Sequence, residues 1–140
     1  MTTPQIIILV LASILALYLG VSYYAFRLAF RRGKKEGRGE PLYENEQLIP
    51  FRKMRMDAIE YAKTTPYENV SIRARDGITL RAKLYDIPDA TGSILLFHGY
   101  RSFGECDFGC ILSHYRDTRR LRILLIDQRA HGDSDGKYIT

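Results

Sequence analysis

The sequence predicts an α/β domain that follows an N-terminal membrane-spanning helix. Residues 5–26 form a run of 22 residues without a charged side chain. Further along, two short apolar runs, SILLF at 93–97 and RILLID at 122–127, flank a segment with helical spacing. Apolar strands that alternate with a helix are typical of a parallel sheet buried between two layers.

The uncharged run is long enough to cross a membrane. As a helix it would extend about 33 Å, and a hydrocarbon core is about 30 Å thick. A cleaved signal peptide is disfavoured because no cation precedes the run and bulky residues follow it. A buried core helix is disfavoured because the run lacks a polar stripe, and Tyr18, Tyr23 and Tyr24 fit an interfacial aromatic belt. We predict that residues 1–30 are a transmembrane anchor with residues 5–26 in the lipid bilayer.

The positive charge of the chain lies beside this run. The 140 residues carry a net charge of +5, and residues 27–40 contribute +4 of it. The cations there are Arg27, Arg31, Arg32, Lys34, Lys35 and Arg38. A basic flank is a topology signal, so nucleic acid is not an expected partner, and the positive-inside rule places the rest of the chain in the cytoplasm. We predict a single-pass protein of the cell membrane.

Residues 31–49 are predicted to be a basic juxtamembrane tether, because they combine Gly, Pro and alternating charges without a sustained period. An amphipathic helix is expected next. Its apolar positions have helical spacing, and Pro50 and Pro66 mark its ends. These positions are Phe51, Met54, Ala58, Ile59 and Ala62. We expect this helix to pack on the following domain; the alternative, a membrane-surface contact, is disfavoured because its polar face carries both signs of charge.

From Glu68 the pattern alternates between apolar and polar residues, which predicts strands. Asp76-Gly77 separates two alternating runs and indicates a tight hairpin turn. The buried strand 93–97, the helical segment 106–115 and the buried strand 122–127 then predict a parallel βαβ unit. The expected sheet therefore has an antiparallel hairpin followed by two parallel strands.

Chemistry is expected where the two buried strands end, since α/β sheets place their sites beyond the carboxyl edge. The segments there are 98–102 (HGYRS) and 127–136 (DQRAHGDSDG). Elsewhere, Cys106, Cys110 and His114 share a helical face, but we interpret them as core thiols and a surface histidine rather than a metal site. We therefore predict no metal. No nucleotide-binding glycine motif occurs, so no cofactor is predicted either.

From about Tyr67 onward the sequence resembles the α/β-hydrolase superfamily. The motifs that carry the resemblance are YENVSI, DGITL, LLFHGY and DQRAHGDSDG, in this order. Ala130 departs from the pattern, because the family usually has Gly there. The resemblance implies the first half of an α/β-hydrolase sheet and a Ser nucleophile, an acid and a His acting on a small ester or peptide.

The resemblance also implies roles for residues at the two strand ends. The backbone N–H of Tyr100 corresponds to one arm of an oxyanion hole, and Arg101 to a wall of the substrate pocket. The remaining residues are expected to be structural and to hold the loops against the strands. They are His98, Gly99, Asp127, Arg129, His131, Gly132 and Ser134.

One motif in this region is misleading. Residues 132–136 match the nucleophile pattern Gly-x-Ser-x-Gly, and Asp127, His131 and Ser134 resemble a local triad. A nucleophile elbow needs a strand that runs directly into the turn and a helix behind the Ser. Here a loop precedes the Ser and KYIT, without helical spacing, follows it. We therefore do not assign Ser134 as the nucleophile.

The nucleophile, the catalytic acid and the catalytic His are consequently expected outside these residues. A complete domain of this kind needs about 250 residues, so we interpret residues 50–140 as its incomplete N-terminal part. A half sheet exposes an apolar edge strand, so we expect the isolated chain to be inactive and poorly stable. The alternative function is a non-catalytic, membrane-associated interaction module built on half of the fold.

Overall fold

The computed structural model describes residues 2–32 and 46–139, and the chain divides into two units, residues 1–31 and 32–140. The first unit is helix α1, Thr3–Phe30. The second contains the 3-10 turn η2 (Glu46–Phe51), helix α2 (Arg52–Thr64), helix α3 (Gly104–Ser113) and four strands. Most of the predicted tether, residues 33–45, lies outside the described residues.

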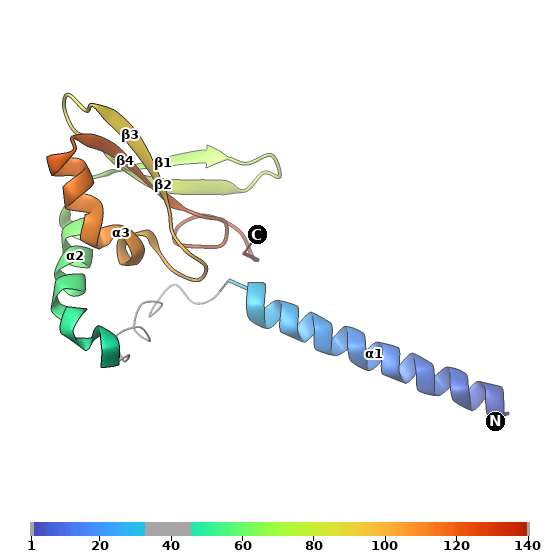
Figure 1. Ribbon diagram of the computed structural model, residues 1–140. Helices are drawn as coiled ribbons and strands as arrows, with labels where there is room; N and C mark the ends of the chain where they lie inside the picture. Colours follow the sequence, from blue (N-terminus) through green and yellow to red (C-terminus); the bar gives the residue numbers. More distant parts are fainter. Residues whose placement is uncertain (1, 33–45, 140) are drawn as a thin grey trace. The chain divides into compact units, whose positions relative to one another are not determined.

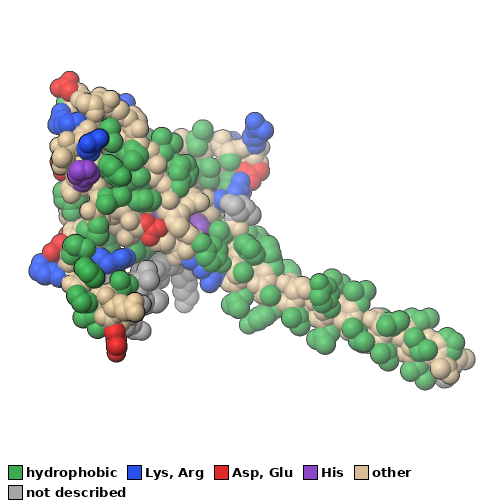
Figure 2. All heavy atoms as spheres, viewed as in Figure 1, with side chains coloured by type: hydrophobic (Ala, Val, Ile, Leu, Met, Phe, Trp, Pro, Cys, Tyr) green, Lys and Arg blue, Asp and Glu red, His purple; other side chains and the backbone are tan. Residues whose placement is uncertain are grey.

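Helix α1 covers the uncharged run predicted from the sequence. Pro4 occupies its first turn, and the N–H of Thr2 donates to Oε1 of Gln5 at 2.9 Å. Its most apolar window has a mean hydropathy of 2.5, none of its residues is buried, and hydrophobic side chains cover its length in Figure 2. The helix is long and apolar enough to span a membrane, a criterion that signal sequences and core helices also meet.

The four strands form one mixed sheet in the order β1-β2-β4-β3 (Figure 1). Their bounds are Glu68–Arg73 for β1, Thr79–Tyr85 for β2, Gly92–Phe97 for β3 and Leu121–Asp127 for β4. Strands β1 and β2 form the predicted antiparallel hairpin. Strands β3 and β4, which precede and follow α3 along the chain, pair with each other in parallel. Both predictions are confirmed. The sequence did not predict that β2 pairs with β4, which leaves β3 at the edge of the sheet.

The helices of this unit pack on one face of the sheet, as Figure 1 shows for α2 and α3. The core consists of Tyr85, Leu96, Ile123 and Leu125 from the strands, with Ala62 from α2 and Leu112 from α3. The hydroxyl of Tyr85 donates to the carbonyl of Ala62 at 2.8 Å, which ties β2 to α2. Burial raises the pKa of the Tyr85 phenol, so this donor keeps its proton.

Helix α2 packs with its second half only. Ile59 and Ala62 are buried, as the apolar spacing predicted. Phe51 and Met54 belong to the same predicted face but are exposed by 52% and 54%. The prediction that this face packs on the domain is therefore wrong for Phe51 and Met54, which lie outside the buried part of the helix.

The opposite face of the sheet is apolar and has no helix over it within residues 46–139. Side chains that share this face by register include Val70 and Ile72 of β1, Leu84 of β2, Leu124 of β4, and Leu95 and Phe97 of β3. Ile72, Leu95 and Phe97 are more than half exposed. The two outer strands differ, since β1 reads ENVSIR whereas β3 reads GSILLF, without a charge. Charged residues are a common protection of a sheet edge, and β3 lacks them.

Candidate functional site

The two segments predicted to carry the chemistry meet at the carboxyl edge of β3 and β4. His98 follows β3 and is 3% exposed. Its Nε2 accepts from the backbone N–H of Gln128 at 3.4 Å, and its Nδ1 lies 2.9 Å from the carbonyl of Gly99. The side-chain amide of Gln128 also donates to the carbonyl of His98. A neutral imidazole with its proton on Nδ1 satisfies both ring contacts, so His98 joins the two loops.

His131 packs against this junction from the loop after β4. It is 1% exposed, and its ring lies edge-on to His98 with 4.6 Å between the centroids. Its Nδ1 is 2.9 Å from the carbonyl of Arg129. The guanidinium of Arg129 in turn donates to Asp76 in the hairpin turn at 2.6 Å. These contacts hold the loop after β4 on the sheet.

The loop after β3 is closed by Asp107 in the first turn of α3. Its carboxylate accepts from the N–H of Gly99 at 2.7 Å and from the hydroxyl of Ser102 at 2.5 Å. The N–H of Ser102 also donates to the carbonyl of Gly99 at 3.2 Å. Asp107 was not among the residues predicted from the sequence. An acidic residue in the first turn of a helix that follows a site loop is the signal that identifies it.

Tyr100 and Arg101 occupy the tip of this loop. Tyr100 is 58% exposed, and the guanidinium of Arg101 lies 5.6 Å from the centre of its ring. Arg101 has a φ of 55°, in the left-handed region that non-glycine residues rarely adopt. The chain therefore turns sharply at the position from which the Tyr100 amide is predicted to serve an oxyanion. That role stays a prediction.

Ser134 is fully buried and bonded to backbone. Its hydroxyl accepts from the N–H of Arg81 at 2.7 Å and donates to the carbonyl of Asp127 at 2.6 Å. The single hydroxyl proton is thus directed at a carbonyl, whereas a nucleophilic serine directs it at a base. The arrangement holds β2 and the end of β4 to the loop.

Gly132 allows Asp127 to sit directly on this loop. The carboxylate of Asp127 accepts from the N–H of Asp133 at 2.8 Å. A Cβ built on Gly132, whose φ is 46°, would lie 2.2 Å from that carboxylate. The loop and the aspartate therefore fit together only if residue 132 has no side chain.

A fluorophosphonate probe is expected to leave Ser134 unmodified, because the hydroxyl is buried and donates to a carbonyl. Peptide mass spectrometry of the labelled, folded chain measures this. Ser134→Ala provides the matched background, and any labelling of the serine-containing peptide above that background contradicts the assignment.

Acid is expected to weaken the loop after β4. The hydrogen bond from Arg81 lowers the pKa of Asp135, and the hydrogen bond from Arg129 lowers the pKa of Asp76. Groups with a lowered folded-state pKa stabilise the fold above their unfolded value, here 3.8, and lose this effect as the pH falls through the folded value. The urea midpoint of unfolding should fall below about pH 4. The urea midpoint should fall less for the Asp135→Asn variant than for the unaltered chain. An equal fall in the two midpoints would exclude the Asp135 carboxylate as a cause.

A polar cleft of about 220 Å³ lies next to the two loops, on the face covered by helices. Its lining comprises Lys83, Ser102, Phe103, Glu105, Asp127, Gly132 and Asp133. Lys83 and Glu105 form an ion pair in its wall. This volume is below the roughly 300–1,000 Å³ typical of ligand pockets, so the cleft is smaller than a usual small-molecule site.

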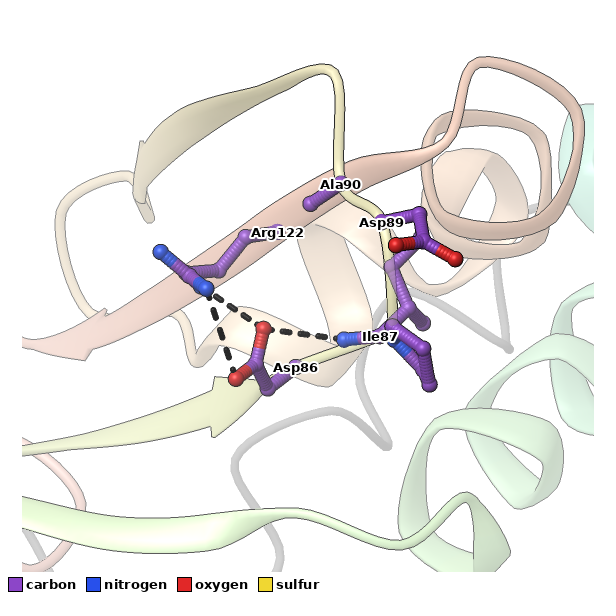
Figure 3. Close-up of a pocket in the computed structure, with 6 residues that line it drawn as sticks. Asp86, Ile87, Asp89, Ala90 and Arg122 are labelled. Carbon is purple, nitrogen blue, oxygen red and sulfur yellow. Dashed lines mark hydrogen bonds and ion pairs between the residues drawn. The ribbon is translucent and has the colours of Figure 1, made fainter.

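A wider hollow of about 540 Å³ lies at the opposite edge of the sheet, between the end of β2 and the start of β4 (Figure 3). Figure 3 shows Arg122 directed at Asp86, and its Nε donates to that carboxylate at 2.7 Å. The hydrogen bond from Arg122 lowers the pKa of Asp86. Because the charges pair with each other and the parallel strands begin here, this hollow is not the candidate site.

Metal ligands do not converge in the part of the chain that the structure describes, where no three His, Cys, Asp or Glu side chains form a group that could hold an ion. Cys106 is buried, and its sulfur accepts from Nη2 of Arg55 at 3.3 Å. Cys110 lies at the surface as a free thiol, so the interpretation of the two cysteines as core thiols is wrong for Cys110. His114 begins a short π-helical turn, His114–Thr118, after α3.

No protein-family model and no curated protein matches this chain. Solved structures with a similar arrangement include an esterase from Pyrococcus furiosus, at 26% identity and a TM-score of 0.46 over 54% of this chain and 28% of that chain. The α/β hydrolase GrgF from Penicillium sp. sh18 has 26% identity and a TM-score of 0.44 over 51% of this chain and 24% of that one. DcsB, solved with a substrate analogue, has 24% identity, a TM-score of 0.44 and the same coverages. This chain thus spans about a quarter of the length of each.

Proposed function

We propose that this chain is the N-terminal part of a membrane-anchored α/β-hydrolase that cleaves a small ester or peptide. The observation that carries the proposal is the junction at His98, where the HGY and DQRAHGDS segments meet at the carboxyl edge of two parallel strands. The sequence resemblance assigns these two segments to the superfamily. In this proposal the nucleophile, the catalytic acid and the catalytic His lie outside residues 1–140.

In this proposal the loop after β3 supplies one donor for the developing oxyanion. The backbone N–H of Tyr100 stabilises negative charge on the carbonyl oxygen of the substrate when it is held about 3 Å away. Asp107 is a positioning residue, because its bonds to Gly99 and Ser102 fix the loop on both sides of Tyr100. Loss of one such donor costs about 3 kcal/mol of transition-state stabilisation.

The test uses the full-length protein translated from the natural reading frame. Its activity is assayed in membranes with short-chain nitrophenyl esters. A fluorophosphonate should label one serine, outside residues 1–140, and this labelling should abolish hydrolysis. Tyr100→Phe, which keeps the backbone donor, should retain kcat. Asp107→Ala should lower kcat about tenfold with little change in KM, as expected for a loop that positions a transition-state donor.

The uncovered apolar face and edge of the sheet favour one alternative, a non-catalytic interaction module that uses this surface. The two functions differ in the labelling experiment. A natural protein without a reactive serine and without ester hydrolysis would refute the hydrolase and leave the module. Under the hydrolase proposal the 140-residue chain by itself is inactive and poorly stable, and measurable turnover by it would contradict this part.

We further propose that α1 anchors the protein in the cell membrane as a single span, with the second unit in the cytoplasm. The uncharged run 5–26 within α1 and the cations that begin at Arg27 support this orientation. Alkaline phosphatase fused after residue 40 should be inactive in a bacterial host, because the enzyme needs the periplasm to fold. An active fusion would reverse the orientation.

A further inference from the structure

The start of α2 presents apolar and basic side chains together at the surface. Ile49, Phe51, Met54 and Met56 are each exposed by 48–56%. Arg52, Lys53 and Arg55 are interleaved with them. We call these seven residues the α2 entry patch. Figure 2 shows hydrophobic side chains at the lower left, with basic and acidic side chains beside them, where α2 begins in Figure 1.

The charge of the α2 entry patch has one sign. Residues 49–56 contain three cations and no acid, and acids lie on either side of them, Glu46 at the start of η2 and Asp57 and Glu60 in the next turns of α2. The mixed charge that argued against a membrane contact therefore belongs to the later part of the helix. Arg55 is engaged with Cys106, and Lys53 reaches Asp57 at 2.6 Å, so Arg52 is the cation of the patch that pairs with no acid among residues 2–32 and 46–139.

The same chain carries a helix that can span a bilayer a short distance before this patch. Residues 31–48 separate the end of α1 from Ile49, which is 18 residues. Such a length reaches at most about 60 Å when extended. A patch tethered within that distance of a lipid surface experiences an effective concentration in the millimolar range, so even a weak surface affinity leads to contact.

We propose that the α2 entry patch docks on the anionic lipid surface of the membrane that holds α1. The apolar side chains enter the boundary between headgroups and acyl chains, and Arg52 faces the lipid phosphates. The inference rests on the proposed membrane anchoring. Docking at the start of α2 gives the sheet and its candidate site a defined orientation toward the bilayer, in addition to the tether.

The chain contains no Trp, so single Trp substitutions report local environment without background. The full chain is reconstituted into vesicles of phosphatidylcholine and phosphatidylglycerol at 3:1, with brominated phosphatidylcholine as the quencher. Phe51→Trp should be quenched at least twofold. Ile72→Trp, an exposed apolar position on β1, is the control and should not be quenched. In vesicles of phosphatidylcholine alone, the quenching of Phe51→Trp should weaken.

Charge reversal on one helix provides a matched pair of variants. In the Phe51→Trp background, Arg52→Glu should reduce docking by about fivefold for each unit of charge changed. Lys63→Glu, an exposed change of the same sign at the far end of α2, should leave the quenching unaltered. Far-UV circular dichroism of both variants establishes that the helices are retained.

The outcomes separate this inference from the anchoring on which it rests. Tyr18→Trp in α1 reports the anchor, and its lack of quenching would refute the membrane span itself. If Tyr18→Trp is quenched while Phe51→Trp matches Ile72→Trp, the anchor stands and the docking is refuted. A blue-shifted but unquenched Phe51→Trp would mean that protein covers the patch, which also overturns the proposal.

Discussion

Gly132→Ala is expected to lower the free energy of unfolding by about 3 kcal/mol or more. The new Cβ would lie 2.2 Å from the carboxylate of Asp127, which would have to leave its bond to the N–H of Asp133. The φ of 46° adds strain for any residue with a side chain. Urea unfolding of the full chain in detergent, followed by circular dichroism, measures the difference.

Gly77→Ala is the matched control for this experiment. Gly77 also has a positive φ, 87°, but a Cβ there would lie 3.7 Å from the nearest side-chain atom, at an ordinary contact distance. Its cost should be about 1–2 kcal/mol, the strain of the left-handed backbone alone. Equal costs for the two variants would show that the close approach of Asp127 contributes nothing.

Glu105→Leu is expected to destabilise the fold by about 3 kcal/mol, because it leaves the ammonium of Lys83 without its partner in the wall of the cleft. The side chains of Lys83 and Glu105 are only 21% and 10% exposed. Burial lowers the pKa of Lys83, but the hydrogen bond and charge of Glu105, with weaker neighbours, outweigh it and leave the pKa above its ordinary 10.5. The pair therefore stabilises the fold at neutral pH and loses this effect as the pH rises through the folded value.

The double variant Lys83→Met/Glu105→Leu separates the pair from the packing around it. Replacing both partners with apolar residues of similar volume should cost less than Glu105→Leu alone, since no buried charge remains. A double-mutant cycle of urea midpoints measures this coupling. Additive costs would mean that the two side chains act independently and that the ion pair is not the source of the stability.

The local parts of the fold followed from the sequence because local patterns determine them. The alternation around Asp76-Gly77 predicts the hairpin, and the two uninterrupted apolar runs predict the parallel strands. The position of β3 at the edge did not follow, because strand order depends on which surfaces of the strands meet after the chain collapses. Likewise, Phe51 and Met54 fit the helical period but are exposed, since periodicity describes one helix and does not show where its neighbours end.

The candidate site was predicted in position but not in its connections. The carboxyl ends of two parallel strands place His98 and Asp127 at one edge by topology alone. That Asp107 fixes the loop after β3 depends on where α3 begins, two residues earlier than its helical spacing indicated, at Gly104. The contacts of His98 with Gln128 depend on the close pairing of β3 with β4, which no single segment encodes.

The contrast between the charged strand β1 and the uncharged strand β3 has a kinetic consequence. A strand from the same chain would cover β3 in a first-order reaction, at a rate independent of protein concentration. Another molecule would cover it in a second-order reaction, whose rate rises with concentration. Dilution should therefore favour intramolecular completion of the sheet, and a high concentration of these chains should favour association through GSILLF. Because β1 carries charged residues, a further strand from the same chain or from another molecule should add beside β3 and not beside β1.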